Sequence, residues 1–161
     1  RSLKSARNIK AVTSTSMENV SVSLAEFNWG SDLGSVQEEI RAGMDRIRKK
    51  SVSQSEYLLR LADKFLYPLG FQPGSPLDPE KRGSHVSLRH PEAYRICKAL
   101  IDPEVGDYIV IPDFREPDNI RLGITPLYTT YTEILIAVRE IKEIIDNKLF
   151  LKYSSEREQV T

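Results

Sequence analysis

The stretch covering residues 117–130 places the strongest constraint on the fold. Its residues 120–125 predict a short strand, which Pro126 ends because proline cannot donate to a strand ladder. Thr130 and Glu133 then match a capping box, and a long amphipathic helix pattern follows. Its apolar positions recur at helical spacing: Ile134, Leu135, Val138, Ile141, Ile144 and Ile145. A strand that leads directly into such a helix favours a helix layer packed on a sheet.

Arg121 lies inside this predicted strand, between Ile120 and Leu122. An unpaired buried charge is costly, so a guanidinium among apolar neighbours needs an anionic partner. Its rigid fork of donors fits a carboxylate through two parallel hydrogen bonds. The alternative is an arginine on an edge strand with its head group in water. The residues alone leave both interpretations open.

The remaining patterns predict the order helix, strand, helix, strand, strand, helix. The first helix starts at Ser35, which forms a capping box with Glu38, and Pro68 and Gly70 end it. Strands are predicted at residues 84–90 and 108–111, and residues 113–119 are predicted as a charged turn. Such a mixture indicates an α+β fold, with helices covering one face of a small sheet.

The single cysteine, Cys97, falls within a helical stripe that follows Pro91. The stripe also contains Ala93, Ile96, Leu100 and Ile101. This position favours a buried core thiol over a nucleophile, and one cysteine excludes an internal disulfide.

The two ends of the chain carry weaker patterns. Residues 1–35 are rich in Ser, Thr and Asn and are predicted to be loosely structured, with a short half-buried strand around Val22 and Leu24. Residues 36–150 form the predicted domain, and residues 151–161 a polar tail.

Composition bounds the class of function. Lys plus Arg is 23 and Asp plus Glu is 23, so the chain has no broad charge field that would attract nucleic acid or a membrane surface. No apolar run is long enough to cross a bilayer, and no signal-peptide pattern is present at the start. A cytoplasmic protein is therefore expected.

Few residues could support self-contained catalysis. His85 and His90 are separated by an odd spacing that places them on opposite faces of a strand, so they make a poor metal pair. The loop over residues 71–83 lacks the Gly-Lys-Ser/Thr arrangement of a phosphate cradle. The basic cluster of Arg46, Arg48, Lys49 and Lys50 is interpreted as a solvated helix face.

Four separated motifs, in order, resemble the C-terminal domain of kynureninase, a pyridoxal-phosphate hydrolase of the aspartate-aminotransferase fold. They are Arg-Gly-Ser-His-Val-Ser-Leu at 82–88, His-Pro-Glu-Ala-Tyr at 90–94, Asp-Phe-Arg-Glu-Pro at 113–117, and the stretch 117–130. The resemblance covers roughly residues 42–146 and implies the small domain of that fold.

The resemblance also implies a function. Kynureninases convert L-kynurenine and water to anthranilate and L-alanine, and a small-domain arginine, here Arg121, is implied to bind the substrate carboxylate. The Schiff-base lysine and the phosphate-binding loop belong to a large domain of more than about two hundred residues. This chain is therefore expected to be inactive alone, to bind pyridoxal 5'-phosphate only within a complete enzyme, and to form a homo-oligomer such as a homodimer. The alternatives are a non-catalytic interaction module derived from the fold, and the small domain of a related enzyme such as a cysteine desulfurase.

Overall fold

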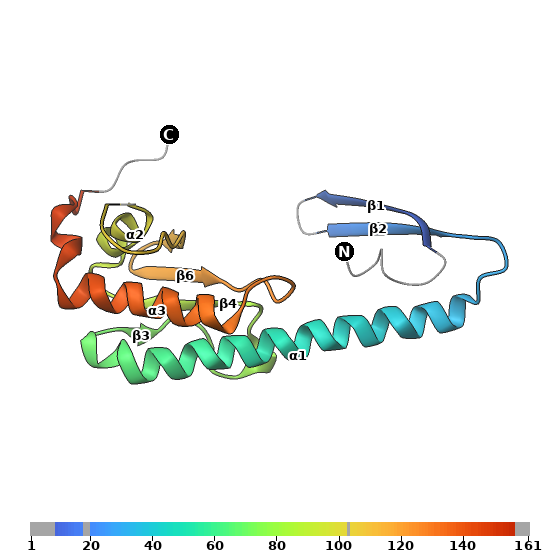
Figure 1. Ribbon diagram of the computed structural model, residues 1–161, viewed down its shortest axis with the longest axis horizontal. Coiled ribbons are helices and arrows are strands. Elements are labelled where there is room, and N and C mark those ends of the chain that lie inside the picture. The colour runs from blue at the N-terminus through green and yellow to red at the C-terminus, as the bar shows by residue number, and fades with distance from the viewer. Residues whose placement is uncertain (1–8, 18–19, 103, 157–161) are drawn as a thin grey trace. The chain divides into compact units, whose positions relative to one another are not determined.

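The computed structural model describes residues 9–17, 20–102 and 104–156 (Figure 1). The chain divides into two compact units, Arg1–Arg48 and Lys49–Thr161. This boundary falls inside a long helix, α1 (Leu33–Phe65). The domain boundaries predicted at residues 35 and 150 stay predictions, and residues 157–161 of the predicted tail lie outside the described residues.

The first unit contains an antiparallel hairpin of β1 (Ile9–Met17) and β2 (Val20–Phe27). β2 includes the strand predicted around Val22 and Leu24, but both of these side chains are exposed rather than half-buried. β1 was not predicted, because its Ser- and Thr-rich sequence has few large apolar residues to mark one face. Its Val and Thr residues nevertheless suit a strand, and pairing with β2 satisfies the backbone of both strands.

α1 begins earlier than predicted. A carboxylate oxygen of Asp32 accepts the Gly34 N–H at 3.0 Å, and the Asp32 carbonyl accepts the Val36 N–H at 3.2 Å. Asp32 therefore caps the helix, and the prediction of Ser35 as the cap is wrong. Aspartate is an equally good capping residue, and its position three residues upstream explains the shift. The predicted end is confirmed, since Gly70 adopts a φ of 97° after the 3₁₀ turn η2 (Tyr67–Leu69).

The second unit contains a four-stranded antiparallel sheet with the order β3-β4-β6-β5. Its strands are β3 (Gln72–Pro73), β4 (His85–Arg89), β5 (Asp113–Arg115) and β6 (Asn119–Gly123). Its helices are α2 (Ala93–Ile101) and α3 (Tyr131–Asp146), with 3₁₀ turns η3 (Pro79–Lys81) and η4 (Leu149–Lys152). No described helix is long and apolar enough to span a membrane.

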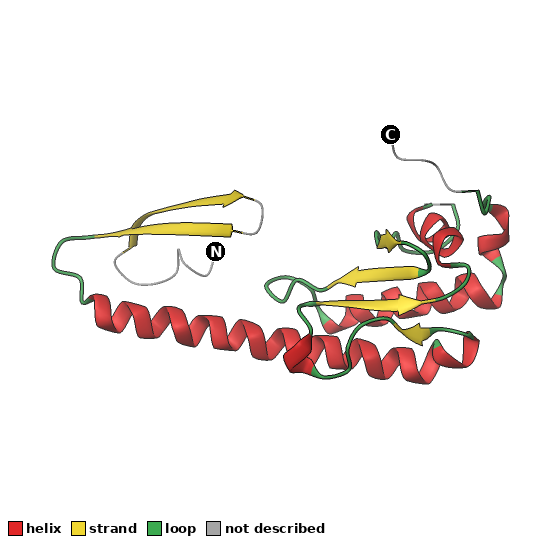
Figure 2. Cartoon of the chain, turned by 180° about the vertical axis from the view of Figure 1, so that it is seen from behind, coloured by secondary structure: helices red, strands yellow, loops and turns green. Residues whose placement is uncertain are grey.

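The core of this unit lies on one face of the sheet. Val86 and Leu88 of β4 and Ile120 and Leu122 of β6 are buried there. They join one cluster with Leu58 and Ala62 of α1, Ile96 and Leu100 of α2, and Ile134, Val138 and Ile141 of α3. Figures 1 and 2, viewed from opposite sides, show α3 in front of the sheet in one view and behind it in the other. The prediction of an α+β fold with helices on one face of a small sheet is confirmed.

One strand formed at a different place from its prediction. Residues 108–111 are not a strand, because the Val110 N–H bonds to the Leu100 carbonyl at the end of α2, at 2.9 Å, instead of joining the sheet. Part of the predicted charged turn, Asp113–Arg115, forms β5 and pairs with β6. The tight turn at residues 116–118 brings these polar residues into register, which outweighs their low strand propensity.

Several local predictions are confirmed. Thr130 Oγ1 accepts the Glu133 N–H at 3.2 Å, and the Glu133 carboxylate accepts the Thr130 N–H at 2.7 Å, which completes the capping box of α3. Cys97 is a buried core thiol, whereas Ile101, predicted in the same stripe, is exposed at the helix end. Just before α2, which begins after Glu92, His90 Nδ1 accepts the Glu92 N–H at 3.0 Å.

Candidate functional site

The sheet of the second unit has a polar face opposite its core. The register aligns Ser87, Arg121 and Asp113 as one row across β4, β6 and β5. The neighbouring row consists of Arg89, Asn119 and Arg115. These six residues alternate along each strand with the core residues, so their side chains point away from the helices. We call this surface the polar sheet face.

Arg121 occupies the centre of the first row, on a strand that has neighbours on both sides. The interpretation of an arginine on an edge strand is therefore wrong. Its Nε donates to Asp113 Oδ2 at 2.9 Å, and Nη2 donates to the same oxygen. The Arg121 side chain is 32% exposed, so the guanidinium is held against the sheet but can reach a ligand. The anionic partner expected for this arginine is an aspartate of the adjacent strand.

Asp113 has a second cationic neighbour. Arg115 Nε donates to the same oxygen, Oδ2, at 3.0 Å. The hydrogen bond from Arg121, followed by that from Arg115, lowers the pKa of the Asp113 carboxyl from its ordinary value. Asp113 therefore stays ionised at neutral pH and joins the two arginines. We call these three residues the Arg121 cluster.

A separate ion pair lies on the same face. Arg89 binds Asp118 through two nitrogens, with Nη2 to Oδ2 at 2.8 Å and Nε to Oδ1 at 3.0 Å. Asn119 Nδ2 donates to the same carboxylate at 3.2 Å. The bond from Arg89 lowers the pKa of Asp118. One arginine thus faces one aspartate, and the pair is electrically balanced.

The loop before β4 approaches this face closely at Gly74. Its N–H donates to the Ser87 carbonyl at 2.8 Å, and a Cβ at this position would lie 2.6 Å from Asn119 Oδ1. Ser75 Oγ accepts the Ser87 N–H at 2.8 Å. A Cβ at this position would displace the Asn119 side chain, so glycine allows the loop to lie close beside the row that contains Arg121.

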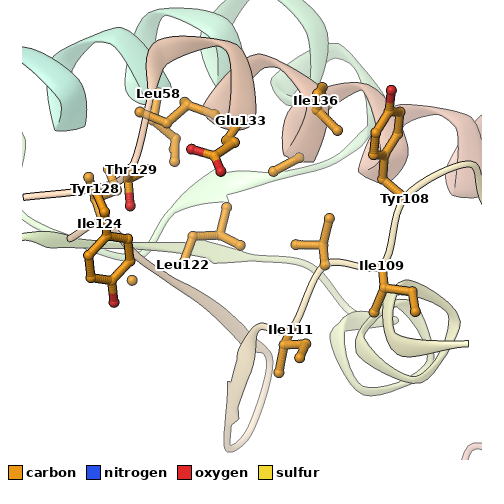
Figure 3. Close-up of a pocket in the computed structure, with 14 residues that line it drawn as sticks. Leu58, Tyr108, Ile109, Ile111, Leu122, Ile124, Tyr128, Thr129, Glu133 and Ile136 are labelled. Carbon is orange, nitrogen blue, oxygen red and sulfur yellow. The ribbon is translucent and has the colours of Figure 1, made fainter. Parts of the chain in front are cut away.

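The opposite side of β6 borders an apolar pocket of about 490 Å³. Figure 3 shows Leu58, Glu133 and Ile136 from the helices on one side and Ile109 and Ile111 from the loop before β5 on the other. Leu122 also lines it, whereas Arg121, the preceding residue of the strand, points to the polar sheet face. The pocket and the Arg121 cluster are therefore separate sites.

The polar sheet face by itself does not fit a pyridoxal phosphate. The cofactor needs a lysine for its Schiff base, and the four strands of this sheet contain none. The guanidiniums of Arg89, Arg115 and Arg121 are each engaged by an aspartate. Among the described residues no cluster of His, Cys, Asp and Glu could hold a metal ion either. The polar sheet face does offer guanidinium N–H groups, which can donate hydrogen bonds to a carboxylate.

The fold and the site define a small α+β domain that presents an arginine on the uncovered face of its sheet. The family model of the kynureninase C-terminal domain matches residues 47–141, and the chain belongs to that family. It is 44% identical over 128 residues to a kynureninase of Geobacillus thermodenitrificans and 41% identical over 128 residues to one of Bacillus thuringiensis subsp. konkukian. A kynureninase of Shouchella clausii is 38% identical over 128 residues.

The family resemblance seen in the sequence is thereby confirmed. Each of these alignments covers 80% of this chain but only 29% of the relative, so the chain spans less than a third of the curated relatives' length. Membership in a kynureninase family implies dependence on pyridoxal phosphate for a complete enzyme.

Two residues of the site could not be recognised as site residues from the sequence. The sequence pattern predicts a turn at Asp113 and Arg115, where side chains have no defined direction. The available signal was the alternation of Asp113, Phe114 and Arg115, with one apolar residue between two charged ones. Three residues are too few for that alternation to outweigh the strand-breaking prolines on both sides.

Proposed function

We propose that this chain is the substrate-binding C-terminal part of a kynureninase-like hydrolase, which converts L-kynurenine and water to anthranilate and L-alanine. Arg121 binds the α-carboxylate of the amino-acid substrate. The observation that carries the proposal is the half-buried guanidinium of Arg121, held in the middle of the polar sheet face in a chain of this family.

The chemical role of this chain is positioning. Two parallel charge-assisted hydrogen bonds from a guanidinium fix both the place and the orientation of a carboxylate. Arg121 lies on a strand whose backbone is paired on both sides, so the position of its Cα is rigid. The bond to Asp113 limits the rotation of the side chain. The cofactor, and the electron-sink chemistry it supplies, belong to the part of the relatives that this chain does not span.

The isolated chain is accordingly inactive and binds neither pyridoxal phosphate nor kynurenine tightly. We further propose that the complete enzyme is a cytoplasmic homo-oligomer and that it has no role in nucleic-acid or membrane binding. The neutral overall charge supports the last point, since no broad positive field is available.

A second candidate function, a non-catalytic interaction module, is favoured by one observation. The loop before β5 exposes Tyr108, Ile109 and Ile111, and Ile111 is 84% exposed. With the adjoining pocket these residues form an apolar surface, and such surfaces often mark interfaces. An interaction module would be a stable oligomer by itself, which sedimentation of the purified chain would detect.

The reaction is tested in a chimaera. The aligned C-terminal part of the Geobacillus thermodenitrificans kynureninase is replaced by the matching residues of this chain, and anthranilate formation is followed by its fluorescence. We expect the chimaera to turn over and Arg121→Gln to raise KM by about 30-fold or more, because loss of a charged partner costs about 2–5 kcal/mol. Arg89→Gln, which removes an arginine already balanced by Asp118, is the matched control.

Besides a chimaera that does not turn over, two results would overturn the proposed function. One is an unchanged KM in the Arg121→Gln chimaera. The other is turnover by the isolated chain with pyridoxal phosphate, accompanied by a Schiff-base absorbance band. That band would place a catalytic lysine in this chain.

A further inference from the structure

The Arg121 cluster holds two guanidiniums and a single carboxylate. Asp113 Oδ2 accepts from Arg121 and from Arg115, so the cluster carries a formal charge of +1. The neighbouring pair of Arg89 and Asp118 carries none. Excess positive charge on the polar sheet face is therefore concentrated at the Arg121 cluster.

The contacts of Arg121 leave part of its guanidinium available. A guanidinium has two edges that can each bind a carboxylate, one formed by Nε and Nη2 and the other by Nη1 and Nη2. Asp113 engages Nε and Nη2. None of the described residues hydrogen-bonds Nη1 of Arg121. The contact with Asp113 therefore orients the guanidinium but leaves its terminal edge, formed by Nη1 and Nη2, available to a ligand.

The strand that supplies Asp113 is itself anchored. Phe114 packs against the core, and its ring meets that of Tyr94 edge to face, with centroids 5.4 Å apart. Because Phe114 points to the core, its two neighbours Asp113 and Arg115 point together to the polar sheet face. The aspartate and the second arginine are therefore held on the same side as Arg121 by one partly buried aromatic residue.

We propose that Asp113 and Arg115 are positioning residues for the carboxylate site, a proposal that rests on the role of Arg121 given above. Asp113 holds the Nε edge of Arg121 and turns the terminal edge toward the ligand. Arg115 neutralises Asp113, so that the aspartate orients Arg121 without cancelling its attraction for an anion. Without Arg115 the cluster would have no net charge, and Asp113 would compete with the incoming carboxylate.

The orienting role is tested on the 161-residue chain itself, without any activity. Side-chain ¹⁵N relaxation of the Arg121 Nε–H group reports how rigidly the guanidinium is held. We expect Asp113→Ala to make Arg121 as mobile as an exposed arginine such as Arg60. Asp113→Asn keeps an acceptor oxygen and should retain most of the order. Unchanged order in Asp113→Ala would overturn the orienting role, whatever the chimaera does.

The charge role is tested by substrate affinity in the chimaera. Arg115→Gln should raise KM roughly 3- to 10-fold, with a much smaller change in kcat, as expected for one charge a few ångströms away in a half-solvated site. Asp113→Asn in the same chain returns the cluster to a charge of +1 and should bring KM back toward the wild-type value. A role in packing alone would show no such rescue.

A third variant of the chimaera, at Arg89, is the control for general charge effects. Arg89→Gln removes the same charge from the same face, but the Arg89 side chain pairs with Asp118 and not with Asp113. It should leave KM within about 2-fold of the wild type. An equal increase of KM in Arg89→Gln and Arg115→Gln, or no rescue in the double variant, would overturn the assignment to Arg115. An inactive chimaera would refute the proposed function while the relaxation measurement still decides the orienting role.

Discussion

Gln54, a buried residue of α1, donates a hydrogen bond of 2.6 Å from its Nε2 to the carbonyl oxygen of Thr129, 75 positions further along the chain. Thr129 closes the turn that follows β6, since its N–H donates to the Thr125 carbonyl at 2.8 Å and its Oγ1 accepts the Thr125 N–H at 3.1 Å. One side chain of α1 therefore fixes the connection between the strand of Arg121 and the capped start of α3.

Gln54→Glu should destabilise the second unit by about 2–3 kcal/mol, because it removes the donor and sets a buried carboxylate oxygen against the Thr129 carbonyl. The free energy of unfolding in urea measures the loss. Arg60→Gln, a change at an exposed position of the same helix, should stay within about 0.5 kcal/mol of the wild type. Equal stabilities of the two variants would contradict the contact.

Arg82→Ala should cost about 2–4 kcal/mol and loosen the proline-rich loop. The Arg82 side chain is buried, and it donates to Ser55 Oγ at 3.2 Å and to the carbonyls of Pro76 and Leu77. Limited proteolysis of residues 73–83 and urea unfolding would both report the change. Lys81→Ala, at the neighbouring exposed position, should alter neither. Protease resistance equal to that of the wild type would refute this assignment.

Glu140→Gln should stabilise the protein at pH 7. The Glu140 side chain is buried, and burial, followed by the charges of Glu143 and Asp107, raises its pKa above the ordinary value of 4.5. A raised pKa in the folded state means that folding favours the protonated acid. The stability gained from this is present below pH 4.5 and lost as pH rises through the folded-state pKa.

The difference in unfolding free energy between Glu140→Gln and the wild type should therefore be largest near neutral pH, shrink as the pH falls through the raised folded-state pKa, and level off below about 4.5. Urea unfolding at several pH values would measure it. Glu156→Gln, at an exposed position, is the control and should show no such trend. A difference that grows toward acid would have the wrong sign and would refute the prediction.

Cys97 should resist alkylation in the folded protein. Burial, and to a smaller extent the charge of Asp113, raises the pKa of its thiol to about 12, so almost no thiolate forms at pH 8. We expect iodoacetamide to react at least about 100-fold more slowly than in urea-unfolded protein, with a rate that follows unfolding. Since the chain has one cysteine, mass spectrometry reads this site without ambiguity. Labelling at the rate of a free thiol would disprove the burial.

The elements with long periodic patterns could be predicted from the sequence. The apolar stripe of α3 and its capping box depend on neighbours within a few residues, and local patterns of this kind are decided by the sequence itself. Arg121 could be singled out for the same reason, since its apolar neighbours mark a charge held inside a strand.

The partners of Arg121 could not be predicted in this way. Asp113 reaches Arg121 only because β5 pairs with β6 in one particular register, and register is a property of the assembled sheet. The segment at residues 108–111 shows the converse. Its sequence suits a strand, yet the bond from Val110 to Leu100 at the end of α2 keeps it out of the sheet. Contacts between distant segments decided both cases.

The alternation of the sheet has a consequence for how this domain can vary. In β4, β5 and β6 the even-numbered positions, such as Val86, Phe114 and Ile120, contribute to the core, and the odd-numbered positions, such as Arg121, carry the polar groups. Sequence drift or directed evolution could therefore retune ligand preference at odd numbers without touching the residues that keep the domain folded. A one-residue slip of β6 against its neighbours would exchange the two sets and abolish folding and recognition together.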